Sequence, residues 1–287
     1  MPTMKAIKGR IKSVKSTQQI TSAMNLVATS KLGRARDKLK KERPYSEQMR
    51  LLMARIAQDI DLAMHPYFAA SKGEKNLVVL VTGDRGLCGG YNSNACRNCY
   101  ENVVKSSQHT DFICVGTKGR DYYVRRGKKI VKTIAGITET PLMLDAEQIA
   151  DIIFPAYKSG EYDTIYLAYT QFHSVVSYEP KVVKLLPIDT SELPELPPAT
   201  SAEIMSFEPA DVSFVENAVA YYVEALIFNA LCESAASQFA SRMVSMETAT
   251  ENAEKMISNL TLTYNRARQA KITQELTEIV AGANALK

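Results

Sequence analysis

Residues 210–281 read ADVSFVENAVAYYVEALIFNALCESAASQFASRMVSMETATENAEKMISNLTLTYNRARQAKITQELTEIVA. These 72 residues contain neither proline nor glycine, the two residues that most often break a helix. Large apolar side chains recur in this stretch at intervals of three and four, from Val219 through Phe239 to Tyr264. The stretch therefore predicts one continuous helix, about 110 Å long at roughly 1.5 Å per residue. A rod of that length does not fit inside a compact globular domain.

A second helical pattern opens the chain and follows a seven-residue repeat. The seam positions of this repeat are Ile7, Ile11, Val14, Gln18, Thr21, Asn25, Ala28, Leu32, Ala35 and Leu39. Several are small or polar, which predicts a thin coil. Pro44 is predicted to interrupt this helix, and a second helical run continues to Met64. Small residues crowd the C-terminal helix at Ala235, Ala236, Ser237, Ala240 and Ser241, and we expect them to let two helix backbones approach closely.

Between the two helical ends, apolar runs alternate with helical patterns. Parallel strands are predicted over 76–82, 111–116 and 128–134, and helices over 91–105, 118–126 and 145–158, the last with Asp145 as its N-cap. Two longer runs, 163–172 and 177–186, predict an antiparallel edge. This order of elements is typical of a Rossmann-like α/β domain with a mainly parallel sheet.

The predicted fold is an antiparallel coiled coil of the N- and C-terminal helices that carries an inserted α/β domain. We divide the chain into a helical region at 1–64, the α/β domain with a proline-rich linker at 65–200, and the long helix at 201–287. An ordinary helix bundle is the alternative for two distant helical segments. It needs turns, however, and the final stretch offers none.

Charge is balanced over the whole chain but not along it. The 287 residues carry a net charge of +4, whereas residues 1–43 hold twelve basic and two acidic side chains, and residues 203–287 hold six basic and eleven acidic ones. The basic N-terminal helix is one candidate for a nucleic-acid surface. Its polar face lacks aromatic residues for stacking on bases, so contact with acidic protein loops is the alternative that we favour.

The sequence favours a cytoplasmic protein. It contains no run of eighteen apolar residues, and its start lacks the apolar block of a signal peptide. The five cysteines form a sparse, odd-numbered set, which fits a reducing compartment. Cys96 and Cys99 form a C-x-x-C pair within a predicted helix rather than at its start. We therefore do not expect a redox or metal site there.

The glycine-rich loop TGDRGLCGGYN, Thr82 to Asn92, lies between a strand and a helix, where such loops often hold phosphate. Its spacing is neither G-x-G-x-x-G nor a P-loop, so a tight turn with Asp84 and Arg85 paired locally or with a partner competes with nucleotide binding. His65, His109 and His173 lie in no nucleophile motif. The sequence thus predicts no catalytic residues, no cofactor and no metal.

Three blocks of sequence carry a resemblance to a known family. They are IKGRIKSVKSTQQITSAMNLVATSKL (Ile7 to Leu32), TGDRGLCGGYN (Thr82 to Asn92) and ESAASQFASRMVSMETATENAEKMI (Glu233 to Ile257), the last followed by LTLTYNRARQAKITQELTEIVAGANAL (Leu260 to Leu286). Together they resemble the gamma subunits of F-type rotary ATP synthases, over both termini and the inserted domain.

The resemblance implies a non-catalytic central stalk. In this family the coiled coil turns inside a hexamer of three alpha and three beta subunits. The α/β domain rests on the membrane c-ring beside the epsilon subunit. One copy is present per complex, peripheral to the cytoplasmic face of the bacterial plasma membrane, and no nucleic acid is involved.

The resemblance also implies contact residues. Met24 matches a position in the coil near an acidic loop of the beta subunits, opposite Arg242. Gln269 and Thr273, with their neighbour Arg268, match the upper contact with a beta subunit. Phe207, Glu208 and Pro209 match the segment that rests on the c-ring and epsilon. The alternatives are plain seam packing for Met24 and ordinary exposed helix positions for Gln269 and Thr273.

The cysteines differ from the family pattern in two ways. The C-x-x-C pair departs from that pattern, and the cysteine insertion of chloroplast members is absent.

Overall fold

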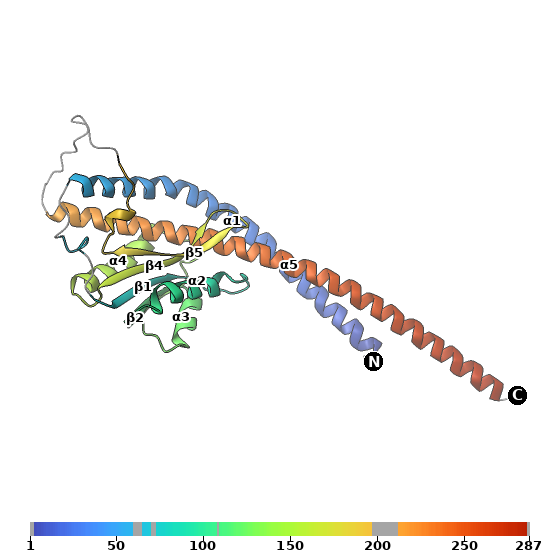
Figure 1. Cartoon of the computed structure of the whole chain (residues 1–287). Helices are drawn as coiled ribbons and strands as arrows, with labels where there is room; N and C mark the ends of the chain where they lie inside the picture. Colours follow the sequence, from blue (N-terminus) through green and yellow to red (C-terminus); the bar gives the residue numbers. More distant parts are fainter. Residues whose placement is uncertain (1–2, 60–64, 70–72, 108, 197–211, 286–287) are drawn as a thin grey trace. The chain divides into compact units, whose positions relative to one another are not determined.

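The computed structural model describes residues 3–59, 65–69, 73–107, 109–196 and 212–285. It contains two compact units, of which the first combines both ends of the chain and the second is one continuous segment (Figure 1). The first combines Met1–Thr29 with Arg242–Lys287, and the second is Ser30–Ser241. Each long helix contributes to both units, so the units do not coincide with the predicted segments 1–64, 65–200 and 201–287.

The two long helices are antiparallel, as predicted. Helix α1 spans Met4–Asp59 (56 residues) and α5 spans Val212–Ala285 (74 residues). In the first unit, Gln18 Nε2 donates to Glu254 Oε1 at 2.9 Å, and the Thr21 and Thr250 hydroxyls lie 2.8 Å apart. Residue numbers rise along α1 while those of their partners fall along α5, which requires opposite directions.

The seam predicted on α1 is confirmed. Each of its ten positions is buried or half-buried, and in the first unit Ile7, Thr21 and Ala28 are 4%, 9% and 1% exposed. Residues between the seam positions are mostly exposed, as the seven-residue repeat requires. The small and polar seam residues therefore pack between the helices.

The interruption predicted at Pro44 is wrong, because α1 continues through it. Proline has no N–H to donate to the carbonyl of Lys40, one turn earlier. Both Lys40 and Pro44 lie on the exposed side of the helix. Water can therefore bind the Lys40 carbonyl, which receives no N–H from Pro44. This lowers the free-energy cost of a proline at this position.

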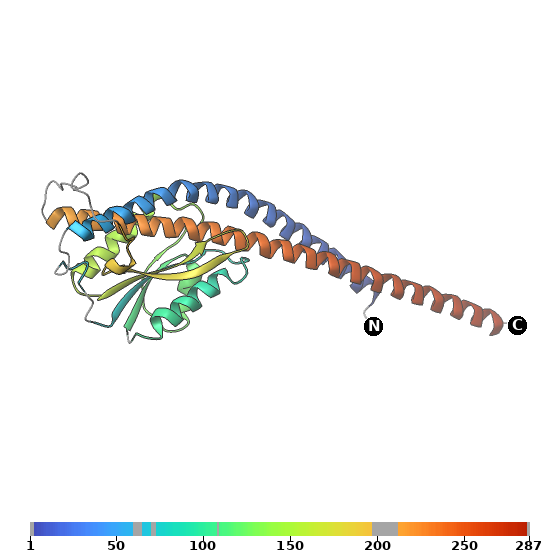
Figure 2. The same cartoon turned by 45° about the horizontal axis from the view of Figure 1, so that its top comes forward.

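The second unit holds a five-stranded sheet in the order β3-β2-β1-β4-β5 (Figure 2). Its strands are β1 (Lys75–Val81), β2 (His109–Val115), β3 (Ile130–Ile134), β4 (Thr164–Phe172) and β5 (Tyr178–Leu186). The first four are parallel, and β5 pairs antiparallel with β4 at one edge. The central strands β1 and β2 are almost wholly buried, which explains their continuous apolar sequence.

The helices of this domain follow the predicted order. They are α2 (Tyr91–Cys99), which continues as a π-helical turn (Tyr100–Val104), α3 (Thr117–Val124) and α4 (Met143–Lys158). Helices α2 and α3 cover one face of the sheet, where Phe112 stacks on Tyr123 with ring centroids 4.0 Å apart. A 3-10 turn, Thr190–Glu192, follows β5.

The cap of α4 differs from the prediction. Leu142 occupies the N-cap position, and Asp145 lies three residues further on. The Asp145 carboxylate accepts a hydrogen bond from the Leu142 N–H at 2.6 Å. Asp145 therefore satisfies a backbone donor at the helix start from within the first turn, as the acidic member of a capping box does.

Candidate interaction sites

The distal part of α5 is an exposed surface. Every residue from 268 to 282 is exposed, including the predicted contact residues Arg268, Gln269 and Thr273. The Thr273 hydroxyl bonds the Gln269 carbonyl of the preceding turn at 3.0 Å. Apolar side chains accompany them at helical spacing: Ile272, Leu276, Ile279 and Val280 are 48%, 58%, 68% and 58% exposed. This end of the helix presents polar and apolar groups that no described residue covers.

Met24 and Arg242 both lie on the inner faces of the coil in the first unit. Met24 is half-buried, and Arg242 is only 7% exposed. The Thr21–Thr250 pair fixes the register of the two antiparallel helices. Met24 is therefore level with about residue 247, roughly one and a half turns along α5 from Arg242. The two side chains belong to neighbouring turns of one seam.

The other three predicted contact residues, Phe207, Glu208 and Pro209, lie outside the described residues.

The glycine-rich loop after β1 is held by its own aspartate. Asp84 Oδ1 accepts from the N–H of Thr117, the first residue of α3, at 3.1 Å. Asp84 Oδ2 accepts from the N–H of Gly136 at 2.9 Å and from the Thr138 hydroxyl at 3.0 Å. These partners lie 33 to 54 residues further along the chain, so Asp84 joins distant segments instead of pairing locally. Its carboxylate caps the N-terminus of α3 rather than that of α2, the helix that directly follows the glycine-rich loop.

The backbone of this loop also approaches its neighbours very closely. Gly116 has φ +93°, and a Cβ built there would lie 2.3 Å from the Thr82 carbonyl oxygen. Only glycine fits this position without displacing backbone. Gly116, which follows β2, thus lets its backbone pass close to the start of the glycine-rich loop.

Helix α5 takes the place of a strand beside the end of β4. The last residue of β4 that pairs with β1 is Ala168. Two residues further on, the Thr170 N–H donates to Ser234 Oγ at 3.2 Å, and the Thr170 carbonyl accepts from Ser237 Oγ at 3.3 Å. Both backbone groups of Thr170 thus point away from β5, toward the side on which β1 has ended. Serine side chains therefore continue the hydrogen bonding of the sheet where its backbone partners end.

Two further polar contacts flank these serines. Ser241 Oγ donates to the Cys88 carbonyl in the glycine-rich loop at 2.6 Å. On the other side, Arg43 Nη2 of α1 donates to the carbonyl of Phe172, the last residue of β4, at 2.8 Å and to Glu233 Oε1 at 3.3 Å. One guanidinium thus joins α1, α5 and the sheet.

We call Arg43, Glu233, Ser234, Ser237 and Ser241 the polar junction. Sequence reasoning assigned the small residues to contact between two helices, and here the serines bind the sheet and its loop. The sequence signal for this contact is the helical spacing of Ser234, Ser237 and Ser241. All three lie on one face of α5, in a stretch where the apolar residues are buried as well.

Charge at the polar junction is buried at some cost. The Glu233 side chain is 4% exposed, and that of Arg43 is 46% exposed. Burial raises the pKa of Glu233, and Arg43 offsets only part of this rise. Ionised Glu233 therefore does not by itself stabilise the fold near neutral pH.

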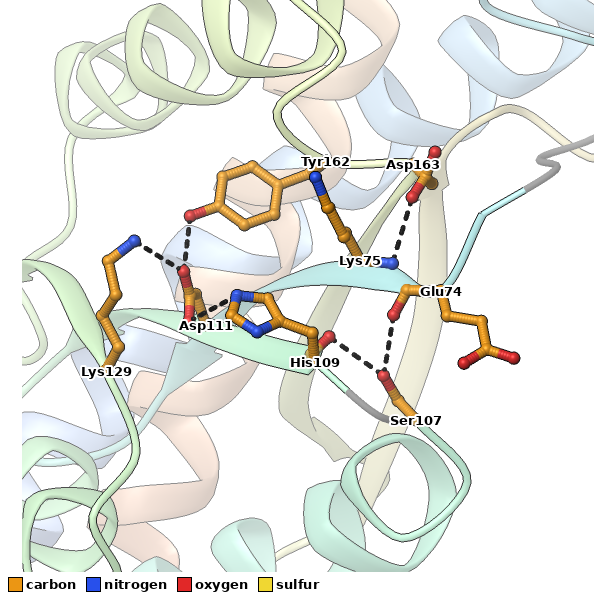
Figure 3. A network of polar contacts seen from close by, with 8 residues as sticks. All are labelled: Glu74, Lys75, Ser107, His109, Asp111, Lys129, Tyr162 and Asp163. Atoms are coloured by element: carbon orange, nitrogen blue, oxygen red, sulfur yellow. Dashed lines mark hydrogen bonds and ion pairs between the residues drawn. The ribbon is translucent and has the colours of Figure 1, made fainter.

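A second polar network lies at the amino-terminal ends of β1 and β2 (Figure 3). Asp111, 2% exposed, accepts from Tyr162 OH at 2.8 Å and pairs with Lys129 Nζ at 2.9 Å, and His109 Nε2 lies 3.4 Å away. Burial alone would raise the pKa of Asp111, but the Lys129 and Tyr162 hydrogen bonds and the neighbouring cations hold it below its usual value. No sequence pattern indicated this network, because its members are distant along the chain.

The cysteines do not form a reactive site. All five are buried, and Cys96 and Cys99 lie within α2, as predicted. Burial raises the pKa of Cys96 to about 12 and that of Cys99 to about 11, so both remain protonated thiols at neutral pH. Among the described residues, no three histidine, cysteine or acidic side chains gather as metal ligands would. No helix in the described ranges is both long and apolar enough to cross a membrane.

Comparison with known proteins assigns the family. The family model described as ATP synthase matches residues 3–286. The ATP synthase gamma chain of Pelotomaculum thermopropionicum is 40% identical over 287 residues, with full coverage of both chains. The chain belongs to the ATP synthase gamma chain family. A gamma chain from Anaeromyxobacter sp. is 41% identical over 293 residues, again with full coverage of both.

Solved structures of this family share the fold. The chain resembles one in the Euglena gracilis mitochondrial ATP synthase with a TM-score of 0.71 and 20% identity, covering 99% of this chain and 94% of the other. A chain of the central stalk and c-ring structure of the Tetrahymena thermophila mitochondrial ATP synthase gives a TM-score of 0.61 and 25% identity, covering 80% and 99%. This chain thus shares its fold with chains of these two ATP synthase structures.

Proposed function

We propose that this chain is the rotor shaft of an F-type ATP synthase. It couples ion flow through the membrane c-ring to ATP synthesis or hydrolysis at the hexamer of alpha and beta subunits, and it is not itself catalytic. Family membership over residues 3–286 carries this proposal. The continuous antiparallel helices α1 and α5 support it, because a shaft must resist bending and twisting.

Coupling requires that the shaft contact the three beta subunits differently at each orientation. A rotor can shift the equilibrium between conformations of a catalytic site only by as much as its contact free energy differs between them. The exposed end of α5 supplies an asymmetric set of polar and apolar groups from residue 268 onward. Such contacts exchange as the shaft turns, without holding one orientation too tightly.

We propose two groups of contact residues. Met24, Arg242, Arg268, Gln269 and Thr273 contact the alpha and beta subunits, and half-buried Met24 and Arg242, 7% exposed, do so only with the edges of their side chains. Arg268, Gln269 and Thr273 are fully available for this role because they lie on the exposed part of α5. Phe207, Glu208 and Pro209 contact the c-ring and the epsilon subunit.

We further propose that one copy is present per complex, peripheral to the cytoplasmic face of the bacterial plasma membrane. The acid-filled glycine-rich loop supports a chain that binds no nucleotide of its own. The basic face of α1, including Lys8, Lys12 and Lys15, then serves acidic protein loops rather than nucleic acid.

Purification and reconstitution test the proposal. An affinity tag on this chain should recover alpha and beta subunits at three copies of each per tagged chain. Vesicles containing the complete complex should build a membrane potential when ATP is added, and complexes prepared without this chain should not. Recovery of the chain without alpha and beta, or ATP-driven transport in its absence, would contradict the proposal.

A further inference from the structure

The contacts between α5 and the sheet differ in kind from ordinary core packing. Apolar contacts have no preferred direction, so two surfaces held by them alone can slide at low cost. Hydrogen bonds weaken steeply when donor and acceptor turn away from one another. The polar junction places such directional bonds at Thr170, Phe172 and Cys88, all on the α/β domain.

We infer that the polar junction holds the α/β domain in a fixed angular position on α1 and α5, so that torque passes between domain and helices without slipping. This inference rests on the proposed rotor function and names the positioning residues on which that function depends. Ser234, Ser237 and Ser241 share one face of α5 and fix it against the sheet. Arg43 fixes α1 to the same sheet end and to α5.

The burial of the polar junction supports a positioning role over a purely stabilising one. Glu233, Ser234, Ser237 and Ser241 are at most 3% exposed, in a part of α5 where every residue from 231 to 241 is buried. Apolar residues at these positions would pack without the desolvation cost of buried polar groups. Hydrogen bonds add a directional restraint on the rotation of α5 about its own axis to the restraint that close packing supplies.

Rotation about the helix axis is the motion that these bonds oppose. The donors and acceptors of Thr170 point to two serines one turn apart, so turning α5 against β4 breaks both bonds together. The Ser241 bond lies one further turn along the helix and resists the same motion at the glycine-rich loop. Several hydrogen bonds, rather than one, therefore resist a torque on α5 at the same time.

Complexes with altered junctions test the inference. The principal variant, S234A/S237A, removes both side-chain partners of the Thr170 backbone and keeps strong helix formers. S159A is the matched control, because the Ser159 hydroxyl bonds the Ala156 carbonyl of its own helix, α4. Complete complexes are reconstituted in vesicles, and ATP hydrolysis and membrane potential, reported by a dye, are measured together.

We expect the double variant to hydrolyse ATP within about twofold of the unaltered rate and to transport roughly threefold fewer ions per ATP, because both directional bonds to Thr170 are lost. The control should keep the unaltered ratio. A merely structural role would lower the yield of assembled complexes but leave ions per ATP unchanged in those that assemble. That unchanged ratio would overturn the inference.

A second pair of variants addresses α1 independently. R43A removes the bonds to Phe172 and Glu233, whereas R43K keeps a cation at the same position. We expect R43A to lower ions per ATP and R43K to restore most of the ratio. Failure of both R43A and S234A/S237A to assemble would show a requirement for folding alone and would also overturn the inference. Absence of transport by unaltered complexes would instead contradict the proposed function.

Discussion

Two buried carboxylates of the second unit have opposite electrostatic environments. Asp111 receives hydrogen bonds from Lys129 and Tyr162 that outweigh its burial, so the fold favours its ionised form. Glu233 is desolvated more than Arg43 can offset, so the fold favours its protonated form. Stability from Asp111 is present above its unfolded pKa and lost as pH falls, whereas Glu233 contributes in the opposite direction. Near neutral pH, therefore, only the ionisation of Asp111 stabilises the fold.

Replacing Asp111 by asparagine should destabilise the chain at neutral pH. The variant keeps the side-chain shape but loses the charge that pairs with Lys129, and we expect a loss of about 1–2 kcal/mol in the free energy of unfolding. The difference from the unaltered chain should shrink as pH falls below roughly 4, where aspartate in the unfolded chain becomes protonated. Urea unfolding between pH 7 and pH 3 measures this, and a difference independent of pH would contradict the assignment.

Replacing Met24 by lysine should lower coupling more than assembly. The substitution puts a cation into a half-buried seam position roughly one and a half turns from Arg242, where acidic partner loops are proposed to lie. New ionic contacts would hold particular orientations of the shaft too tightly. Ions transported per ATP should fall, while M24L, which keeps an apolar side chain, should not change the ratio. A parallel drop of transport and hydrolysis would count against the contact.

At the scale of elements, the sequence predicted the order and nearly all the boundaries. Repeats and alternation are local signals, so the seam of α1, the strand order along the chain and the unbroken α5 could all be recognised. The course of α1 through Pro44 could not, because the cost of a proline depends on whether its unpaired carbonyl reaches water. The polar junction could not either, since the partners of its serines are backbone groups of distant residues.

Substituting Pro44 by alanine should stabilise α1. Alanine restores an N–H that can donate to the Lys40 carbonyl and has the highest helix propensity. We expect a gain of about 1–2 kcal/mol, less than the full cost of a buried helix proline because the site is exposed. Thermal unfolding of the purified chain gives the sign directly. A lower melting temperature for P44A than for the unaltered chain would contradict this prediction.

At the scale of the whole molecule, local patterns predicted an inserted α/β domain and paired terminal helices, and the family resemblance supplied the function. The glycine-rich loop shows the limit of pattern alone. Its position after a strand suits a phosphate, whereas in the structure its Asp84 carboxylate ties the loop to Thr117, Gly136 and Thr138.

Truncation after Gln269 should weaken rotation without abolishing it. The removed residues are exposed throughout the described part of this segment, so the rest of the fold does not depend on them. Packing of the α1–α5 seam, including the Thr21–Thr250 pair, is retained. ATP-driven rotation should persist at reduced torque, and the melting temperature should change little. Complete loss of hexamer binding would show that the end of α5 is the principal attachment.

The most direct measurement of the central claim is rotation of the α/β domain itself. All five native cysteines are buried, so V124C on exposed α3 provides a selective attachment point for a rod on a hexamer fixed to glass. We predict that added ATP turns the rod in one direction, with three pauses per turn, at a rate that follows ATP hydrolysis. A rod that stays still, or that diffuses freely in both directions, while the same complexes hydrolyse ATP would contradict the account.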